Sequence, residues 1–457
     1  MNTKQAAALA ATGVLASLSL SACDLDVSDL NNPRLDELEN NPTDVSLGAA
    51  ATGLLIGNRS NKAAANGYVS QLGIIGREAF DFDSADPRFI SELIQGQLNS
   101  AGPFGGNFWT LPYGNIQLAN IVLHGVDKVA NLDDAQKAAI RGFAKTIQAL
   151  DLLEVINTHD TNGAVIDTDH GTTGALGDIV DKDTVFTEIE RLLDDAVADL
   201  TAGGDSFPFL MSEGYAGFDD PADFLKFNRG IRARVAAYQT TPDYPKVLSS
   251  LADSFIDDSA AADFTTGVYY TYTTKTGDVT NGLINPNIYA HPSIETDVQK
   301  KGDLNDLRFT AKVKAKKAGA SKGLSSALGF TMYTSPSSPL PLIRNEELIL
   351  LKAEALFFTG MKAAAIAELN IVRERAGGLD PLTGEPSDAT FIDELLYERR
   401  YSLLFEGGHR WIDLRRFGRL PSLPIDNPMH TRNLRYPIPL TECNARPNEA
   451  RCGLGST

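Results

Sequence analysis

The chain has 457 residues, of which 43% are hydrophobic, so it can bury one large core or two ordinary ones. Asp and Glu number 59 against 41 Lys and Arg, which gives a net charge of −18. This excess of negative charge disfavours binding to nucleic acid or to an anionic membrane surface, and a neutral or cationic ligand fits it better.

The first 22 residues have the pattern of an export signal. Lys4 provides a short basic start, and residues 6–20 form an alanine-rich apolar run. That run is short for a membrane-spanning helix, and no later stretch is long and apolar enough to span a bilayer. The run ends in LSAC at 20–23, which resembles a bacterial lipobox. The resemblance implies cleavage before Cys23 and lipidation of that cysteine, unless the cysteine stands there by chance.

Residues 23–41 are polar and acidic, and we interpret them as a tether that leads to a single domain over 42–457. Apolar residues then recur at helical spacing in a series of segments. The predicted helices are 43–57, capped by Thr43 or Asn41, then 109–126, 133–157, 184–200, 221–239, 345–359, 362–376 and one that begins at Phe391.

Strand signals are few. The segment GVYYTYTTKTG at 267–277 is rich in Thr and Tyr, and a hairpin is expected there. Residues 76–108 are expected to be irregular. Asp81 and Asp83 have the spacing of a calcium loop, but the sixth position of an EF-hand needs Gly, and Asp86 stands there. The match is weak, and no metal site is predicted.

The remaining two cysteines, Cys443 and Cys452, lie nine positions apart in a tail rich in Pro, Gly and Asn. In an exported protein such a pair is most simply a disulfide, with a contribution to stability of about 2–3 kcal/mol. A metal site is disfavoured because two thiols without a nearby His fall short of four ligands.

Residues 391–418 combine a high density of charge with aromatic residues. An amphipathic helix from Phe391 is expected to end at Gly407-Gly408, because glycine adopts the left-handed conformation without steric cost. The arginines allow an anion site, but within 391–420 six Arg face five Asp or Glu, and a phosphate site needs a surplus of positive charge. We therefore favour a structural latch that comprises Glu398, Arg399, Glu406, Arg410, Trp411, Asp413 and Arg415.

Residues 346–378 have the pattern of a tetratricopeptide-type helix pair. Ala353, Gly360 and Ala367 are small where such pairs cross, in a unit of about 34 residues. An ordinary helical hairpin is the alternative from these residues alone.

Three segments together resemble the SusD/RagB family of nutrient-binding outer-membrane lipoproteins. The most specific is ERRYSLLFEGGHRWIDLRRFG at 398–418, and the others are the helix pair at 346–378 and the tail from Tyr436, in which Ala445-Arg446 departs from the family pattern. The resemblance implies an all-α, right-handed, tetratricopeptide-like superhelix with long loop insertions. It also implies that the signature at 391–457 is architectural.

The resemblance further implies a surface-exposed, lipid-anchored protein of the outer membrane. Such a protein captures a nutrient, typically a glycan, and passes it to a partner SusC-like TonB-dependent transporter. An Asp directly after the lipidated cysteine, as at Asp24, is an inner-membrane retention signal in enterobacteria. The sequence therefore does not decide which of the two membranes carries the lipid anchor. No nucleophile elbow, P-loop, HExxH or CxxC motif is present, and we predict neither enzymatic activity nor a cofactor. A helical scaffold without a small ligand and a periplasmic hydrolase are the alternatives.

The variable segment 262–343 has the composition of ligand-binding loops. Sugar sites combine a flat aromatic ring with polar donors and acceptors. The candidate binding residues are Tyr269, Tyr270, Tyr272, Asn285 and Tyr289. Tyr270 and Tyr272 also alternate as one buried strand face would. The only tryptophans, Trp109 and Trp411, belong to predicted scaffold segments, so a peptide or another nutrient remains open as the ligand.

Overall fold

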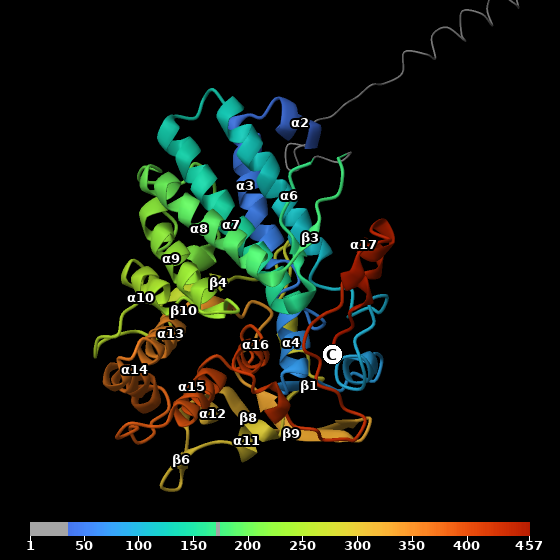
Figure 1. Cartoon of the computed structure of the whole chain (residues 1–457), viewed down its shortest axis with the longest axis vertical. Coiled ribbons are helices and arrows are strands. Elements are labelled where there is room, and N and C mark those ends of the chain that lie inside the picture. The colour runs from blue at the N-terminus through green and yellow to red at the C-terminus, as the bar shows by residue number, and fades with distance from the viewer. Residues whose placement is uncertain (1–34, 171–173) are drawn as a thin grey trace, which may run out of the picture.

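The computed structural model describes residues 35–170 and 174–457 (Figure 1). The leader, Cys23 and most of the tether lie outside these residues. The described chain is mostly helical, which confirms the predicted all-α class. Its α-helices are α2 (Leu35–Asn40), α3 (Asp44–Arg59), α4 (Tyr68–Ile75), α5 (Arg88–Ser91), α6 (Thr110–Gly125), α7 (Asp134–His159), α8 (Lys182–Thr201), α9 (Pro221–Tyr238), α10 (Tyr244–Ala252), α11 (Ser293–Thr296), α12 (Leu307–Lys312), α13 (Asn345–Phe358), α14 (Lys362–Arg375), α15 (Asp388–Ser402), α16 (His409–Arg416) and α17 (Leu440–Ala445).

The strands are short and pair in twos, always antiparallel. The pairs are β1 (Ala79–Asp81) with β5 (Ile288–Ala290), β4 (Gly267–Tyr270) with β10 (Leu340–Arg344), β2 (Ala164–Val165) with β3 (Ile179–Val180), β6 (Lys300–Lys301) with β7 (Leu304–Asn305), and β8 (Val313–Ser321) with β9 (Leu324–Phe330). No described helix is both long and apolar enough to cross a membrane.

Side-chain caps begin the long helices at or near the predicted positions. The Thr43 hydroxyl accepts a hydrogen bond from the backbone N–H of Ser46 at 3.0 Å, and the Ser46 hydroxyl accepts one from the backbone N–H of Thr43 at 2.9 Å. Asp133 and Gln136 form the same reciprocal pair at the start of α7. Each pair satisfies N–H groups that the first helical turn leaves without partners.

Helices α3, α6, α7, α8 and α9 pack in succession in one half of the molecule, and α13 to α16 lie in the other half (Figure 1). The close approach of α7 to α8 requires a glycine, since a Cβ on Gly142 would lie 2.6 Å from Cγ of Leu200. Helices α13 and α14 form the predicted pair. One core cluster runs through both halves and includes Leu54, Phe143 and Trp411.

Two predictions of local structure are wrong. The segment 267–277 is not a hairpin, because β4 ends at Tyr270 and pairs with β10, about seventy residues further along the chain. The segment 76–108 is not wholly irregular, since it contains β1 and α5. In both cases the strand partner is distant in sequence, so local residue pattern does not reveal the pairing.

Gly407-Gly408 does not end the helix that contains Phe391. Helix α15 ends at Ser402, where Lys312 and Arg344 donate hydrogen bonds to the carbonyl oxygen of Ser402. Gly408 has φ 71° and precedes the first residue of α16. Cationic side chains from distant segments therefore stabilise the end of α15, and the glycine serves the start of the next helix.

The two C-terminal cysteines form a disulfide, with their Cα atoms 5.6 Å apart. It joins Cys443 on α17 to Cys452 on the short 3-10 helix η6 (Ala450–Gly453). The structure therefore contains the predicted pair.

Candidate ligand-binding site

The charged residues of the C-terminal signature pair with one another and with distant segments. Glu398 is fully buried between Arg308 at 2.5 Å and Arg373 at 3.0 Å. Arg399 donates from Nε to Asp413 at 2.7 Å. Buried charges are tolerated where they are paired in this way, so these contacts support the interpretation as a structural latch.

The aromatic part of the same signature is also enclosed. Trp411 is fully buried, and its Nε1–H donates to the carbonyl oxygen of Asn433 at 2.8 Å. The guanidinium of Arg415 lies 4.4 Å from the Trp411 ring, and its Nη2 donates to the carbonyl oxygen of Asn157 at 2.6 Å. Glu406 accepts from Arg344 at 3.0 Å. Arg410 is different, because its Nε and Nη1 have no partner among the described residues.

The candidate binding residues do not gather in one cavity. Tyr270 donates its hydroxyl to Asn58 at 2.9 Å and points into the protein. Tyr272 has only 3% of its surface exposed, so its ring face is not open to a ligand as predicted. The ring of Tyr289 packs 5.1 Å from that of Phe82. Tyr270 is half-buried on β4, and Tyr272 is buried beyond the end of that strand, so neither residue presents the flat sugar-binding surface that was predicted.

The other two candidates have local roles in the structure. Tyr269 donates its hydroxyl to the carbonyl oxygen of Thr265. Asn285 accepts a hydrogen bond from the backbone N–H of Asn287 at 2.9 Å, which stabilises a turn. Both residues line none of the cavities described below.

The region around Asp81 has the hydrogen bonds of turns. The Asp81 carboxylate accepts from the N–H of Asp83 at 2.9 Å, and that of Asp83 accepts from the N–H of Ala85 at 2.9 Å. Burial raises the pKa of Asp81 to about 6. Among the described residues no group of three His, Cys, Asp or Glu is placed to hold a metal ion.

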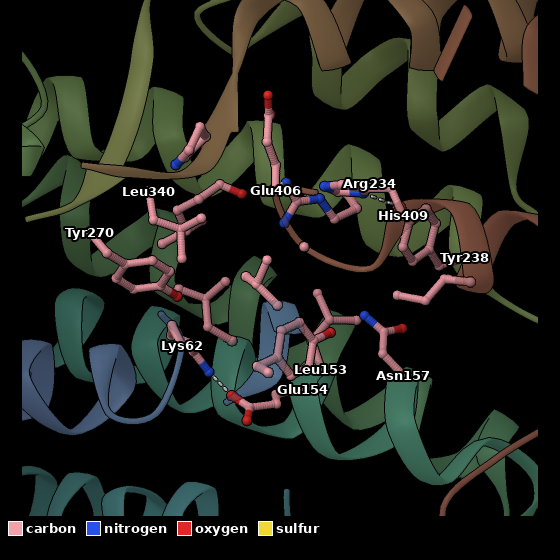
Figure 2. A pocket seen from close by; sticks show the side chains of 17 residues that line it. Lys62, Leu153, Glu154, Asn157, Arg234, Tyr238, Tyr270, Leu340, Glu406 and His409 are labelled. Carbon is pink, nitrogen blue, oxygen red and sulfur yellow. Dashed lines mark hydrogen bonds and ion pairs between the residues drawn. The ribbon is translucent and has the colours of Figure 1, made fainter. Parts of the chain in front are cut away.

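A cavity of about 80 Å³ lies between α7, α9, β4, β10 and α16, and we call it the inner cavity (Figure 2). Lys62 reaches across one side of it to form an ion pair with Glu154 (Figure 2). Arg234, on the opposite side, binds Glu347 through two hydrogen bonds of 2.7 and 2.6 Å. The inner cavity is far smaller than the roughly 300–1,000 Å³ of small-molecule pockets.

Burial shifts the titration of the groups around the inner cavity. It lowers the pKa of Lys62 to about 8 and that of His409 to about 4, so His409 is neutral at pH 7. It raises the pKa of Asp151 to about 7, although the side-chain amides of Asn58 and Asn115 each donate to that carboxylate at 2.7 Å. The network links α3, α6 and α7, and it serves the packing of these helices.

A larger groove of about 410 Å³ adjoins the inner cavity, and Lys62 lies in the lining of both. We call it the outer groove. The end of α3, the loop that follows it, the start of α6 and the chain after β4 form its walls. Its lining residues are Ile56, Arg59, Ser60, Asn61, Lys62, Ala63, Ala64, Leu111, Tyr272, Val279 and Thr280.

The outer groove exposes apolar side chains to solvent. Leu111 is 54% exposed, and Ile56 and Val279 are exposed to a similar degree. Arg59 is held in place, because it donates to Asp278 at 2.6 Å and to the carbonyl oxygen of Thr271 at 2.5 Å. Its guanidinium lies 5.5 Å from the ring centre of Tyr272. The groove thus offers apolar contact beside a fixed cation and nearby hydroxyls.

The backbone beside the outer groove is strained. Asn61 has φ 60° and Phe108 has φ 61°, both in the left-handed region that non-glycine residues rarely adopt. Both residues line a cavity of about 100 Å³, which shares Asn61 and Leu111 with the groove. Strained residues of this kind often cluster at binding sites.

Sequence reasoning missed the outer groove. Most of its lining comes from residues 56–64, which lie in a predicted helix and the loop after it, and only Tyr272 was a candidate. An exposed Leu or Ile within an amphipathic helix carries no distinctive sequence signal, because single exposed apolar residues are common.

Residues 264–449 match the model of the SusD family. The fold is similar to that of a SusD-like carbohydrate-binding protein from Bacteroides fragilis, with a TM-score of 0.70 and 15% identity, covering 90% of this chain and 99% of that chain. A SusD superfamily protein from Bacteroides vulgatus matches with a TM-score of 0.66 and 12% identity, over 88% of this chain and 97% of that one. No curated protein sequence matches the chain.

A laminarin-binding SusD-like protein is also similar, with a TM-score of 0.59 and 19% identity, over 87% of this chain and 97% of that chain. At identities this low, the structural similarity establishes the fold alone. The family match rests on the C-terminal part of the chain, which contains the signature. Residues 264–449 therefore match the SusD family, and the described chain has the fold of SusD-like proteins over most of its length.

Proposed function

We propose that the protein is a non-catalytic, lipid-anchored receptor of the outer membrane that binds a glycan in the outer groove. The observation that carries this proposal is the groove itself, of about 410 Å³, with exposed apolar side chains beside a fixed arginine. A volume above about 300 Å³ suits a small-molecule ligand. Similarity in fold to a carbohydrate-binding and a laminarin-binding protein supports the glycan class.

The lining of the outer groove suits the two kinds of surface that a sugar presents. Leu111 and Val279 would contact the apolar C–H faces of the sugar rings. Ser60, Thr280 and Arg59 would exchange hydrogen bonds with its hydroxyl groups. Because Arg59 is already paired with Asp278, the groove has little net charge, and a neutral oligosaccharide fits it.

The protein is proposed to bind its ligand without hydrolysing it. A glycosidase needs two carboxylates about 5–10 Å apart across the scissile bond. None of the described residues that line the groove is Asp or Glu. The groove therefore has the chemistry of capture without hydrolysis.

Anchoring and delivery complete the proposed role. Lipidation at Cys23 would hold the protein at the outer membrane through the tether of residues 23–41. A SusC-like TonB-dependent transporter would then receive the captured ligand. Co-purification of a large outer-membrane barrel with the full-length protein tests this partnership, and recovery of the protein alone would count against it.

The binding experiment uses a form that lacks residues 1–23. Glycan and peptide arrays identify the ligand class, and calorimetry then compares wild type with Leu111→Ser and Val279→Ser. We expect each variant to weaken glycan binding at least fivefold through lost apolar contact. Leu304→Ser is the matched control, because Leu304 is 71% exposed on β7 and is not part of the groove.

The outcomes of these experiments test separately the location of the site, the class of the ligand and the receptor function. Unchanged affinity in both groove variants would move the site elsewhere on the protein. Binding to peptides alone would keep the capture role and change the ligand class. Silence on both arrays would overturn the proposed receptor function.

A further inference from the structure

A separate pocket of about 310 Å³ lies between α15, α16 and the short 3-10 helix η5 (Leu420–Ser422). We call it the arginine pocket. It shares no lining residue with the outer groove or the inner cavity. Its lining residues are Asp297, Asp393, Leu396, Tyr397, Arg400, Arg410, Asp413, Leu414, Arg419 and Ser422.

Two of the three aspartates in the lining are paired at the mouth of the pocket. Arg400 donates to Asp297 at 2.7 Å, and Arg419 lies 3.1 Å from Asp393. The side chains of Asp297 and Asp393 are 46% and 65% exposed, so the pocket opens to solvent beside these pairs. Their negative charges are compensated by the two arginines.

The third aspartate, Asp413, is compensated beneath the pocket. It accepts from Nε of Arg399 at 2.7 Å on one oxygen and from Arg416 at 3.2 Å on the other. Arg416 is itself paired with Glu354 at 3.0 Å. Asp413 lies three residues after Arg410 on α16, yet both of its oxygens are directed to other arginines.

These ion pairs therefore leave Arg410 as the arginine of the pocket lining without an acidic partner among the described residues. It is 9% exposed, and within the described residues its Nε and Nη1 have no hydrogen-bond partner. A buried charge without a counter-charge is strongly unfavourable. An anion that enters the pocket would supply the missing partner.

The remaining lining indicates which anion fits. Leu396, Leu414 and the ring of Tyr397 form an apolar surface beside Arg410. Tyr397 directs its hydroxyl away to Asp306 at 2.9 Å, so its ring is its contribution to the pocket. An inorganic ion would leave this apolar surface in water, whereas an organic acid would cover it and pair with the guanidinium.

We propose that the arginine pocket binds the carboxylate of a small organic acid of about monosaccharide size, such as a uronic acid, with Arg410 as the anchor. The single unpaired cation matches a ligand with one negative charge. It does not match a polyanion such as nucleic acid, which needs several uncompensated cations. The proposal is independent of glycan binding in the outer groove.

The test measures binding of potassium D-glucuronate by calorimetry at constant ionic strength, with chloride as the compensating anion and D-glucose as the neutral comparison. We expect wild type to bind glucuronate and not glucose at this pocket. Arg410→Gln should weaken glucuronate binding at least tenfold, and Arg410→Lys should weaken it less because the charge remains. Arg191→Gln is the control, because Arg191 is 53% exposed on α8 and lines neither the arginine pocket nor the outer groove, and it should leave this affinity unchanged.

Thermal unfolding in chloride buffer distinguishes an anchor from a structural residue. Removal of an uncompensated buried charge should leave the melting temperature of Arg410→Gln equal to or above that of wild type. Glucuronate should raise the melting temperature of wild type and not that of Arg410→Gln. Equal glucuronate affinity in wild type and Arg410→Gln, or no preference of wild type for glucuronate over chloride and glucose, would overturn the proposal. If Arg410→Gln does not fold, Arg410→Lys and the wild-type preference decide the question.

Discussion

Trp411 provides the sharpest test of the structural latch. Its side chain is fully buried against Tyr436, whose ring centre is 6.3 Å away, and beneath the guanidinium of Arg415. Replacement by Ala removes most of a side chain that buries about 150–250 Å². We expect Trp411→Ala to lower the free energy of unfolding by about 3–5 kcal/mol.

The site has little room to collapse into the space that the indole vacates. A Cβ on Gly76 would lie only 3.2 Å from Cβ of Trp411, so the turn after α4 already contacts this residue closely. The carbonyl oxygen of Asn433 would also lose the Nε1–H donor that it accepts at 2.8 Å. Trp411→Phe removes the same donor but keeps part of the aromatic volume, so it should lower the free energy of unfolding by less than Trp411→Ala does.

The assay is urea unfolding followed by far-ultraviolet circular dichroism. Fluorescence is unsuitable, because the chain has two Trp and the substitution would remove one of them. Leu304→Ala is the surface control and should stay within about 0.5 kcal/mol of wild type. A loss below about 1 kcal/mol in Trp411→Ala would refute the latch as a packed structural unit.

Three further predictions concern stability. Glu347→Gln should lower the free energy of unfolding by about 3–5 kcal/mol, because it leaves Arg234 charged and buried without its partner, and Glu347→Gln with Arg234→Met should lose less than Glu347→Gln alone in the same urea assay. Cys443→Ser opens the disulfide loop and should reduce stability by about 2–3 kcal/mol, with faster proteolysis of the C-terminal tail as the local readout. Burial raises the pKa of Glu78 from 4.5 to about 8, so the folded protein retains a proton that the unfolded chain releases above pH 4.5. That contribution to stability is complete below pH 4.5 and is lost towards pH 8 at up to about 1.4 kcal/mol per pH unit; Glu78→Gln should flatten this part of the pH profile, and an unchanged slope would contradict the assignment.

Sequence alone was sufficient for the helical scaffold. Helix α7 illustrates this. Asp133 and Gln136 form the capping pattern that predicts its start, and apolar residues at helical spacing predict its buried face. Local rules apply here because each hydrogen bond in the cap joins residues three positions apart. The pairing of Cys443 with Cys452 was predictable for a similar reason, since few alternatives exist in the tail.

Contacts between distant segments were not predictable. The strand at Gly267–Tyr270 pairs with Leu340–Arg344, although nothing in either segment identifies the other. The end of α15 depends on Lys312 and Arg344, which approach Ser402 from outside the helix. Tyr272 is buried through a contact of the same kind, because Arg59 at the end of α3 lies over its ring.

The count of charged residues in 391–420 shows how much of the ion pairing a single segment of sequence can predict. Six Arg against five acidic residues indicated near balance, which is right for most of the segment. The structure adds acids from other elements, among them Glu354 for Arg416 and Asp297 for Arg400, and still leaves Arg410 without an acidic partner among the described residues. Which arginine is left without an acidic partner depends on the directions of the side chains in the folded protein. The local sequence does not determine these directions.

The proposed ligand surface lies largely outside the segment that matches the family. The family match over 264–449 contains the latch, whose residues must satisfy one another in a closed core. Most of the outer groove comes from residues 56–64 and Leu111, which lie before the matched region. Substitutions of Ile56 or Leu111 change exposed side chains and leave the buried ion pairs of the latch intact, so such changes should alter the groove without loss of the fold. The two surfaces should therefore respond separately: groove variants should alter affinity at constant melting temperature, and latch variants should alter melting temperature first.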